Sequence, residues 1–147
     1  MDYRIVNAGK RHLDALVELE QRCFSVPWTR GQLEAELPDV HHEFLAAESG
    51  DTLVGYVGMM FVLDEGYISN VAVAPEYRRQ GVAAALIREL LKRAAEKKLS
   101  FVTLEVRESN EGAIALYGGE GFTAVGRRKS YYERPREDAL LMTKFFT

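Results

Sequence analysis

The sequence has 147 residues, of which 47% are hydrophobic and 28% are charged, the ordinary balance of a globular domain with a buried core. Its 19 Lys and Arg residues are outnumbered by 22 Asp and Glu residues, so no basic excess favours nucleic acid as a partner. No apolar run approaches the length of a membrane span, and the N-terminus lacks the apolar core of a signal peptide, which argues against a membrane partner. We therefore expect one domain over residues 1–147.

The few cysteine and histidine residues limit the redox and metal chemistry that the chain can carry. Cys23 is the single cysteine, which excludes an internal disulfide and fits the reducing cytoplasm. No base is paired with it in the sequence, so we expect it to pack in the core rather than to act as a nucleophile. His12, His41 and His42 lack the spacing of metal ligands. We expect these three at the surface or at edges, and we predict no metal.

The first half of the chain predicts three strands and two amphipathic helices. The strands are expected at 3–6, 43–48 and 53–62, the last two forming a hairpin, and the helices at 10–22 and 30–36. Pro27 disfavours helix at the residue before it, and Thr29 is expected to cap the second helix. The connection that contains Trp28 would either close the helix pair as a buried plug or face a substrate as the wall of a cleft.

The stretch from residue 66 to residue 84 has the form of an anion site. An apolar strand at 67–73 ends before Pro75, and a basic turn around Gly81 then opens a long helix. Unpaired backbone N–H groups and the positive end of the helix dipole meet at such a turn, and arginine suits phosphate. Neither GxxxxGK[ST] nor GxGxxG occurs in the chain, so this is not a Walker loop or a dinucleotide fingerprint. The alternative is an ordinary strand-to-helix turn with surface arginines.

The second half is expected to return to the same sheet. Residues 101–106 predict a strand parallel to 67–73, reached by a right-handed crossover. Asn110 can cap a helix at 111–117, which the glycine-rich run at 118–121 is expected to end. The last two strands are expected at 122–127 and 139–145, linked by residues 128–138.

Two polar side chains lie where apolar ones are expected. Glu105 is inside an apolar strand and points to the face opposite its two apolar neighbours. A carboxylate there is costly unless it is paired or used, so it either forms an ion pair with Arg107 or Arg128 or borders a cleft as a functional group. Tyr117 lies among the core residues of the next helix, where its hydroxyl would either find a hydrogen-bond partner or serve the chemistry of the cleft.

Two blocks of the sequence resemble the GCN5-related N-acetyltransferases (GNAT family), which bind acetyl-CoA. Arg78-x-x-Gly81-x-Ala83 after Val-Ala-Val is similar to the family's pyrophosphate loop, and the second block is a strand, an Asn-capped helix and Tyr117-x-x-x-Gly121-Phe122. Within the family the sequence is most similar to the RimI-type enzymes, which acetylate the N-terminal alanine of a small-subunit ribosomal protein. Four stretches from residue 23 to residue 142 carry that likeness: Cys23-Phe24-Ser25-x-Pro27-Trp28, Arg78-Arg79-Gln80-Gly81, Leu104-Glu105-Val106-Arg107-x-Ser109-Asn110, and Tyr131-Tyr132 with Glu137-Asp138-Ala139-x-x-Met142.

The resemblance implies an α/β (α+β) GNAT fold: a mixed, mostly antiparallel sheet with a central parallel strand pair splayed for CoA, and about four helices. It also implies direct transfer from the cosubstrate acetyl-CoA, with Glu105 as general base and Tyr117 as general acid. The contacts that it implies with the cofactor come from the backbone of Val71, Ala72 and Val73, from the pyrophosphate loop at Arg78, Arg79, Gln80, Gly81, Val82, Ala83 and Ala84, and from Asn110. Asn110 would contact the pantetheine arm, cap its helix, or do both. Trp28, Tyr131 and Tyr132 would line the peptide cleft, with packing across the sheet as the alternative for the two tyrosines.

The sequence departs from the RimI-type pattern at a few positions. Glu120 stands where an apolar residue is usual, Gly118-Gly119 makes the turn after Tyr117 flexible, and Ala83 replaces a common glycine. These departures leave open whether the acceptor is an N-terminal peptide or a small amine such as a polyamine, an amino acid or a drug. An acidic lid formed by Glu65, Glu120 or Glu133 would favour a polyamine. A CoA-binding sensor or partner subunit is the non-catalytic alternative.

Overall fold

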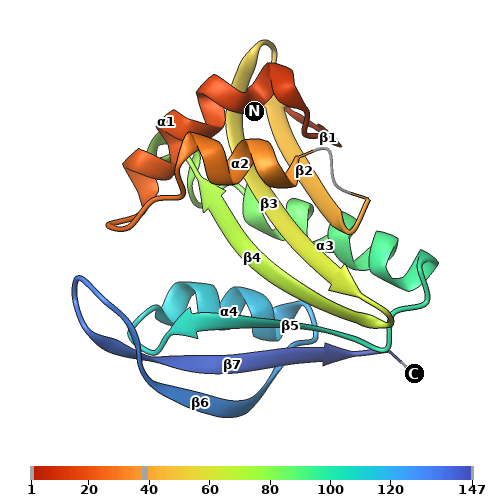
Figure 1. Cartoon of the computed structure of the whole chain (residues 1–147), viewed down its shortest axis with the longest axis vertical. Coiled ribbons are helices and arrows are strands. Elements are labelled where there is room, and N and C mark those ends of the chain that lie inside the picture. The colour runs from red at the N-terminus through yellow and green to blue at the C-terminus, as the bar shows by residue number, and fades with distance from the viewer. Residues whose placement is uncertain (1, 38–39, 147) are drawn as a thin grey trace.

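The computed structural model describes residues 2–37 and 40–146, which form one seven-stranded sheet with helices packed on it (Figure 1). The strands follow the order β1-β2-β3-β4-β5-β7-β6, and only β4 and β5 pair in parallel. The strands are β1 (Arg4–Asn7), β2 (His42–Ser49), β3 (Thr52–Val62), β4 (Glu65–Val73), β5 (Phe101–Arg107), β6 (Thr123–Tyr132) and β7 (Glu137–Phe145). The helices are α1 (Leu13–Cys23), α2 (Arg30–Glu36), α3 (Val82–Glu96) and α4 (Glu111–Gly119), with short 3₁₀ turns at η1 (Lys10–His12) and η2 (Pro75–Tyr77). The predicted fold class is confirmed.

Two apolar clusters hold the layers together. Leu86 and Leu90 of α3 are fully buried against the strands, in a cluster that also includes Tyr117 of α4 and is called the α3 cluster below. Leu16 of α1 and Leu33 of α2 are fully buried in a second cluster, the α1–α2 cluster, together with residues of β2, β3 and β4. Figure 1 shows α1 and α2 on one side of β2–β4 and α3 on the other. The strands β2–β4 are therefore buried on both faces.

β4 and β5 are paired over a short length and then separate. Their register joins Glu65 to Phe101, Gly66 to Val102 and Tyr67 to Thr103. Beyond these pairs the two strands diverge, as Figure 1 shows. A Cβ on Gly66 would lie 3.0 Å from the Met59 sulfur and 3.2 Å from Val102, so glycine allows the close packing at this junction. The divergence leaves the backbone of the second half of β4 without a partner on the β5 side.

A β-bulge at Ser69 changes the alternation of β4. Ile68 is opposite Met59 on β3 and Asn70 is opposite the next residue, Gly58, so Ser69 has no partner of its own. Ile68 packs in the α3 cluster, whereas Asn70 hydrogen-bonds to Glu20 of α1. The bulge thus turns Asn70 toward the α1 side of the sheet.

The C-terminal end of α4 differs from the prediction. The helix continues through Gly118 and Gly119, which had been expected to end it. It ends two residues later, within the predicted glycine-rich run, where Gly121 adopts φ +96° and the Phe122 N–H donates to the Tyr117 carbonyl at 3.0 Å. The left-handed residue, rather than the first glycine, fixes the end of the helix.

Several strand boundaries also differ from those predicted, by one to five residues. β4 begins at Glu65, two residues earlier than expected. β6 continues to Tyr132 because its pairing with β7 resumes, after an irregularity beyond Arg128, at the pair of Tyr132 with Glu137. The connection between β6 and β7 is therefore a short turn rather than the long loop that was predicted.

His12 is buried, so its predicted place at the surface or at an edge is wrong. Its Nδ1 accepts a hydrogen bond from the Gly9 N–H at 2.9 Å, and its Nε2 lies 2.8 Å from Glu48 Oε1. Glu48 is 4% exposed and also accepts from Arg11. A buried carboxylate needs such partners, and His12 joins η1 to β2 by supplying one.

Candidate functional site

A cleft of about 720 Å³ opens where β4 and β5 separate. Its walls come from the segment between α1 and α2, from β4 and β5, from α4, and from the turn between β6 and β7. Elements that are distant in the sequence thus meet around one space. The residues predicted from the sequence that line it are Trp28, Val71, Glu105, Asn110, Tyr117, Tyr131 and Tyr132.

Glu105 faces the cleft and is also ion-paired. Its neighbours Leu104 and Val106 are buried in the α3 cluster, so the carboxylate points to the other face of β5. Arg128 of β6 donates from Nε to Glu105 Oε1 at 3.1 Å. The Glu105 side chain is 23% exposed and that of Arg128 is 56% exposed. Both alternatives that the sequence left open, the ion pair and the place at a cleft, therefore hold for the same residue.

Tyr117 presents a protonated hydroxyl to the cleft. Its side chain is 7% exposed and packs against Phe122 with 5.8 Å between ring centroids. Burial raises the pKa of Tyr117 to about 12, because a phenolate would lose its hydration there. Tyr117 lines the cleft, and burial alone, with no hydrogen bond from a described residue, accounts for the shift in its pKa.

The N-terminus of α3 has the geometry expected of an anion site. Gly81 is the N-cap with φ +80°, a conformation that glycine adopts without strain, and its carbonyl accepts the first helical bond from Ala85. The N–H groups of Val82, Ala83 and Ala84 precede that bond and have no partner within the helix. These groups lie at the positive end of the helix dipole, where a phosphate is favoured.

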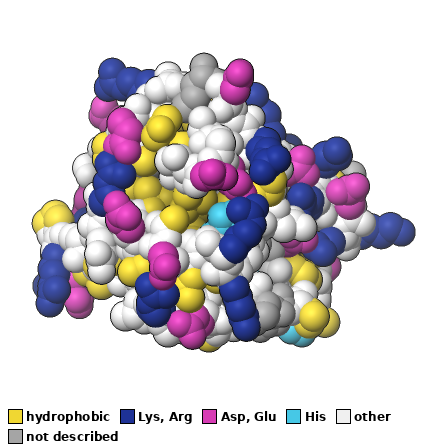
Figure 2. All heavy atoms as spheres, turned by 90° about the horizontal axis from the view of Figure 1, so that it is seen from above, with side chains coloured by type: hydrophobic (Ala, Val, Ile, Leu, Met, Phe, Trp, Pro, Cys, Tyr) yellow, Lys and Arg dark blue, Asp and Glu magenta, His cyan; other side chains and the backbone are white. Residues whose placement is uncertain are grey.

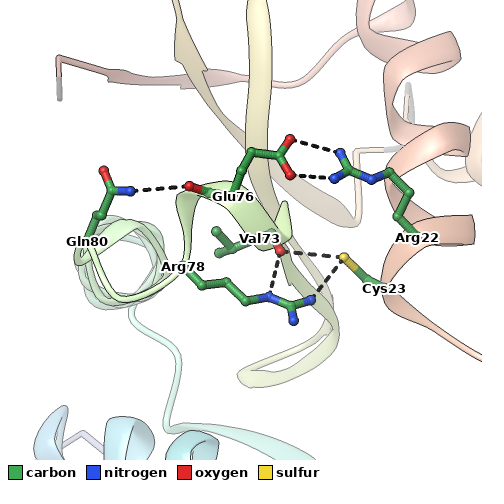
Figure 3. A network of polar contacts seen from close by, with 6 residues as sticks. All are labelled: Arg22, Cys23, Val73, Glu76, Arg78 and Gln80. Atoms are coloured by element: carbon green, nitrogen blue, oxygen red, sulfur yellow. Dashed lines mark hydrogen bonds and ion pairs between the residues drawn. The ribbon is translucent and has the colours of Figure 1, made fainter.

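Arg78 is directed toward the end of β4 (Figure 3). Its Nε donates to the Val73 carbonyl at 3.1 Å, and its Nη2 lies 3.6 Å from Cys23 Sγ. The same figure shows Arg22 of α1 paired with Glu76 of η2. To contact a pyrophosphate, the Arg78 side chain would have to leave its two partners. Cys23 packs against the α1–α2 cluster, as the sequence predicted.

Asn110 caps α4 and lines the cleft at the same time. Its Oδ1 accepts from the Ala113 N–H at 3.1 Å, the capping bond that the sequence predicted. The amide nitrogen is not engaged in that bond. Asn110 can therefore hold the start of the helix and still offer a donor to a ligand.

Aromatic side chains form the outer wall of the cleft. Tyr131 and Tyr132 are in edge-to-face contact, with 5.0 Å between ring centroids. The guanidinium of Arg107 lies 4.5 Å from the Tyr132 ring centroid, and its Nη2 donates to the Glu133 carbonyl at 3.0 Å. Arg107 thus holds the β6–β7 turn against the cleft.

Sequence reasoning did not single out Glu20, a fully buried carboxylate that lines the cleft. It accepts hydrogen bonds from the Trp28 N–H at 2.7 Å, from Asn70 Nδ2 at 3.2 Å and from the Tyr56 hydroxyl. Burial, with Glu20 next to it, raises the pKa of Tyr56, so that the phenol stays a donor. A signal was available, because position 20 lies four residues after Leu16 on the apolar stripe of the helix.

Within residues 2–37 and 40–146, no three His, Cys, Asp or Glu side chains are grouped as metal ligands would be. On the face seen in Figure 2, acidic and basic side chains are interspersed among the described residues. No helix in the described ranges is both long enough and apolar enough for a membrane span.

Comparisons with known proteins agree with this geometry. The model of the Acetyltransferase (GNAT) family matches residues 13–122. The ribosomal protein bS18-alanine N-acetyltransferase of Escherichia coli (strain K12) is 34% identical over 132 residues, 88% of this chain and 88% of that protein. The crystal structure of the ribosomal-protein-S18-alanine N-acetyltransferase from Escherichia coli superposes with a TM-score of 0.93 at 30% identity, over 99% of this chain and 95% of that one. The PaiA N-acetyltransferase from Thermoplasma acidophilum, solved in complex with coenzyme A, shares the fold with a TM-score of 0.84 at 18% identity, over 99% of this chain and 100% of that one. The chain therefore belongs to the acetyltransferase (GNAT) family, whose acetyl donor is acetyl-CoA.

Proposed function

We propose that this protein transfers the acetyl group of acetyl-CoA to the N-terminal α-amine of a protein, namely the N-terminal alanine of ribosomal protein bS18, and that residues 1–147 act as one acetyltransferase domain. The observation that carries the proposal is the cleft at the β4–β5 divergence, which is lined by both Glu105 and Tyr117. The relatives named as bS18-alanine N-acetyltransferases support the choice of substrate. The single sheet, which runs from β1 to β7, supports one domain.

In the proposed reaction Glu105 acts as general base. An α-amine has a pKa of about 8, so at neutral pH about nine-tenths of it is ammonium and cannot attack. Glu105, directly or through a water, takes one proton, and the nitrogen lone pair then forms a bond to the thioester carbonyl carbon. A positioned base of this kind typically contributes about 10²–10⁴ in rate.

Tyr117 acts as general acid in the second half of the reaction. The C–S bond breaks, its electron pair goes to sulfur, and the phenol gives its proton to the departing thiolate. The second proton of the amine leaves as the amide forms and restores the phenol. With a pKa of about 12, the Tyr117 hydroxyl carries its proton at neutral pH, as a general acid must before the C–S bond breaks.

The residues assigned to acetyl-CoA fit the local geometry. Val71, Ala72 and Val73 lie on the part of β4 that has left β5, so the pantetheine arm can pair with their backbone as an added strand. The free N–H groups at the start of α3, from Gly81 to Ala84, would hold the pyrophosphate, with Arg78, Arg79 and Gln80 beside them. Asn110 would reach the arm from the opposite wall.

The acceptor side of the cleft favours a peptide over a polyamine. Trp28, Tyr131 and Tyr132 offer aromatic walls to an extended chain. Of the three residues that could have formed an acidic lid, Glu120 is paired with Arg88 through both carboxylate oxygens, and Glu65 accepts from Tyr67. Only the third, Glu133, lines the cleft. A lid suited to a polycation is therefore not assembled from these residues.

The test is an acetyl-CoA turnover assay that follows release of the free thiol. The acceptors are short peptides that begin with Ala, Ser or Met, together with spermidine and free amino acids. We expect turnover with the alanine-led bS18 peptide and none when its α-amine is blocked. Turnover with small amines alone would contradict the proposed acceptor and keep the family. Acetyl-CoA binding without turnover of any acceptor would favour the sensor or partner-subunit alternative.

A further inference from the structure

One buried polar atom in the cleft has no partner. The Oδ1 of Asn70 hydrogen-bonds to none of the described residues, although the side chain is only 6% exposed and lines the cleft. An unpaired buried acceptor has lost its hydration without gaining a partner, so native proteins seldom retain one without a use. The atom is therefore suited to a donor that arrives with a ligand.

The orientation of the Asn70 amide follows from its neighbour. Glu20 offers only acceptor atoms, so the Asn70 NH₂ group must face it, as the 3.2 Å bond from Nδ2 to Glu20 Oε2 shows. The Oδ1 then lies on the side of the amide that faces away from Glu20, where none of the described residues donates a hydrogen bond to it. The Trp28 N–H and the Tyr56 hydroxyl hold the carboxylate from its other sides. A rotated amide would place the Asn70 oxygen against the Glu20 carboxylate, where the two acceptors repel each other. This repulsion fixes the orientation of the Asn70 amide.

The charge of Glu20 points to the kind of donor. Within the described residues, its partners are a backbone N–H, an amide and a phenol, and no Lys, Arg or His side chain pairs with it. A fully buried carboxylate is normally paired with a positive charge. The acceptor substrate of an N-acetyltransferase brings one, because its amine arrives as ammonium.

The bulge at Ser69 places this pair on the acceptor side of the cleft. Asn70 projects toward α1 and Trp28, whereas its neighbour Val71 packs in the α3 cluster. Glu105 also projects away from that cluster, and it lines the same cleft. Asn70 and the proposed base therefore come from the two separated strands and line the same cleft.

We propose that Asn70 binds the nitrogen to be acetylated, by accepting one of its N–H groups on Oδ1, and that Glu20 is a positioning residue that orients the amide and supplies negative charge behind it. This inference rests on the proposed function in that the cleft must take a primary amine. It adds an amine-recognition pair to a site whose base and acid are Glu105 and Tyr117.

The experiment compares two peptides on the enzyme–CoA complex by titration calorimetry. One is an alanine-led peptide, and the other carries a propionyl group in place of the alanine, so that only the amine is missing. Wild-type protein is expected to bind the amine peptide more tightly. In Asn70→Leu, which keeps the volume and removes the acceptor, the amine peptide should bind about tenfold or more weakly, as expected for a hydrogen bond to a charged group. Binding of the propionyl peptide and of CoA should not change.

Two further variants keep the result interpretable if Asn70→Leu folds poorly. Glu20→Gln keeps the shape and removes the charge, and it should also weaken the amine peptide selectively. Tyr56→Phe disturbs the same network without removing the Asn70 acceptor, and it should keep the difference between the two peptides.

Three results would overturn the inference: equal weakening of both peptides, no weakening of either in Asn70→Leu, or a wild-type protein that does not prefer the amine. If the turnover assay finds that a small amine is the acceptor, the proposed function fails on its own. The comparison is then run with that amine and its des-amino analogue, and the same three results decide it.

Discussion

The Glu105 carboxylate lies between Arg128 and the cleft. The ion pair to Arg128 is close, with 3.1 Å between Nε and Oε1, but the arginine side chain is 56% exposed. Pairs in contact with water contribute about 0–1 kcal/mol to folding, so the ion pair alone is a weak reason for a carboxylate in this strand. The position of Glu105 at the cleft is a stronger reason for a carboxylate in this strand.

Glu105→Gln should therefore lower kcat about 10²- to 10⁴-fold, since the amide keeps the shape but cannot take a proton. The Kd for CoA, measured by calorimetry, should stay within error of the wild-type value. Arg128→Gln is the matched control, because it breaks the same ion pair and leaves the carboxylate in place. Equal losses in the two variants would mean that Glu105 acts through the pair and not as a base.

At the scale of elements, Arg107 joins β5 to the turn between β6 and β7. Its guanidinium donates to the Pro135 carbonyl at 2.9 Å and to the Glu133 carbonyl at 3.0 Å, and it lies over the Tyr132 ring. A lysine ammonium is a point charge and cannot make this planar set of contacts at once. The position of the β6–β7 turn thus depends on the planar guanidinium of Arg107.

Arg107→Lys should raise the KM for the acceptor peptide several-fold, because the aromatic wall of the cleft would be less well fixed. The KM for acetyl-CoA should change little, since the assigned cofactor contacts lie on β4, α3 and α4. Steady-state kinetics with each substrate varied in turn separates the two. A rise in the KM for acetyl-CoA alone would show that the turn serves the donor.

The contact of η1 with β2 gives the fold a dependence on acid. Hydrogen bonds from His12 and then from Arg11 lower the pKa of Glu48 from 4.5 to about 2. Because this pKa is lower in the folded protein, the stabilisation is fully present above about pH 4.5 and is lost as the pH falls toward 2.

The free energy of unfolding, measured by urea titration at a series of pH values, should therefore fall across that window by an amount on the order of 1–3 kcal/mol from this group. In Glu48→Gln the free energy of unfolding should not show this fall between pH 4.5 and pH 2, although the variant is less stable at neutral pH. Parallel curves for the two proteins would exclude Glu48 as the source.

At the scale of the whole molecule, the sheet consists of two parts that meet at a short junction. β1–β4 and β5–β7 are joined directly by three register pairs between β4 and β5. A ligand that lies in the divergence and contacts both strands would add a second connection. Ligands that bind only the folded state stabilise it in proportion to ln(1 + [L]/Kd).

CoA at 100 times its Kd should thus stabilise the protein by about 2.7 kcal/mol, measured as a rise in the thermal unfolding midpoint. ADP is the control, because it offers a pyrophosphate to the start of α3 without a pantetheine arm, and its effect at equal concentration should be smaller. Equal shifts from CoA and ADP would indicate that the arm does not bridge the strands.

Most of the fold could be predicted from the sequence because its signals are local. Apolar alternation located the strands, and the Thr29 and Asn110 caps gave the starts of α2 and α4 correctly. The misplaced boundaries depend on information that is not local. β6 reaches Tyr132 because β7 pairs with it there, and α4 passes through Gly118 and Gly119 because its end is set by the conformation of Gly121.

Residues of the candidate site could be predicted where a charged side chain interrupts an apolar sequence pattern. They could not be predicted where their importance comes from a contact with a residue that is distant in the sequence. Glu105 stands out as a charge inside an apolar strand. Glu20 carries a weaker signal of the same kind, a charge on the apolar stripe of a helix, and only the folded protein brings it to Asn70 and Trp28. His12 was misplaced for the same reason, because its partner Glu48 is far away in the sequence.

The bulge at Ser69 also has a consequence for the tolerance of β4 to substitution. Before it, the even-numbered Gly66 and Ile68 face the α3 side; after it, the odd-numbered Val71 and Val73 do, while Ala72 and Ala74 pack beneath α1. The strand therefore carries two alternation patterns of opposite phase. A scan of all single substitutions should find that an apolar side chain is required on the α3 side at Ile68 before the bulge and at Val71 and Val73 after it. Gly66 should tolerate no larger residue, and Ala72 and Ala74 should tolerate only small ones.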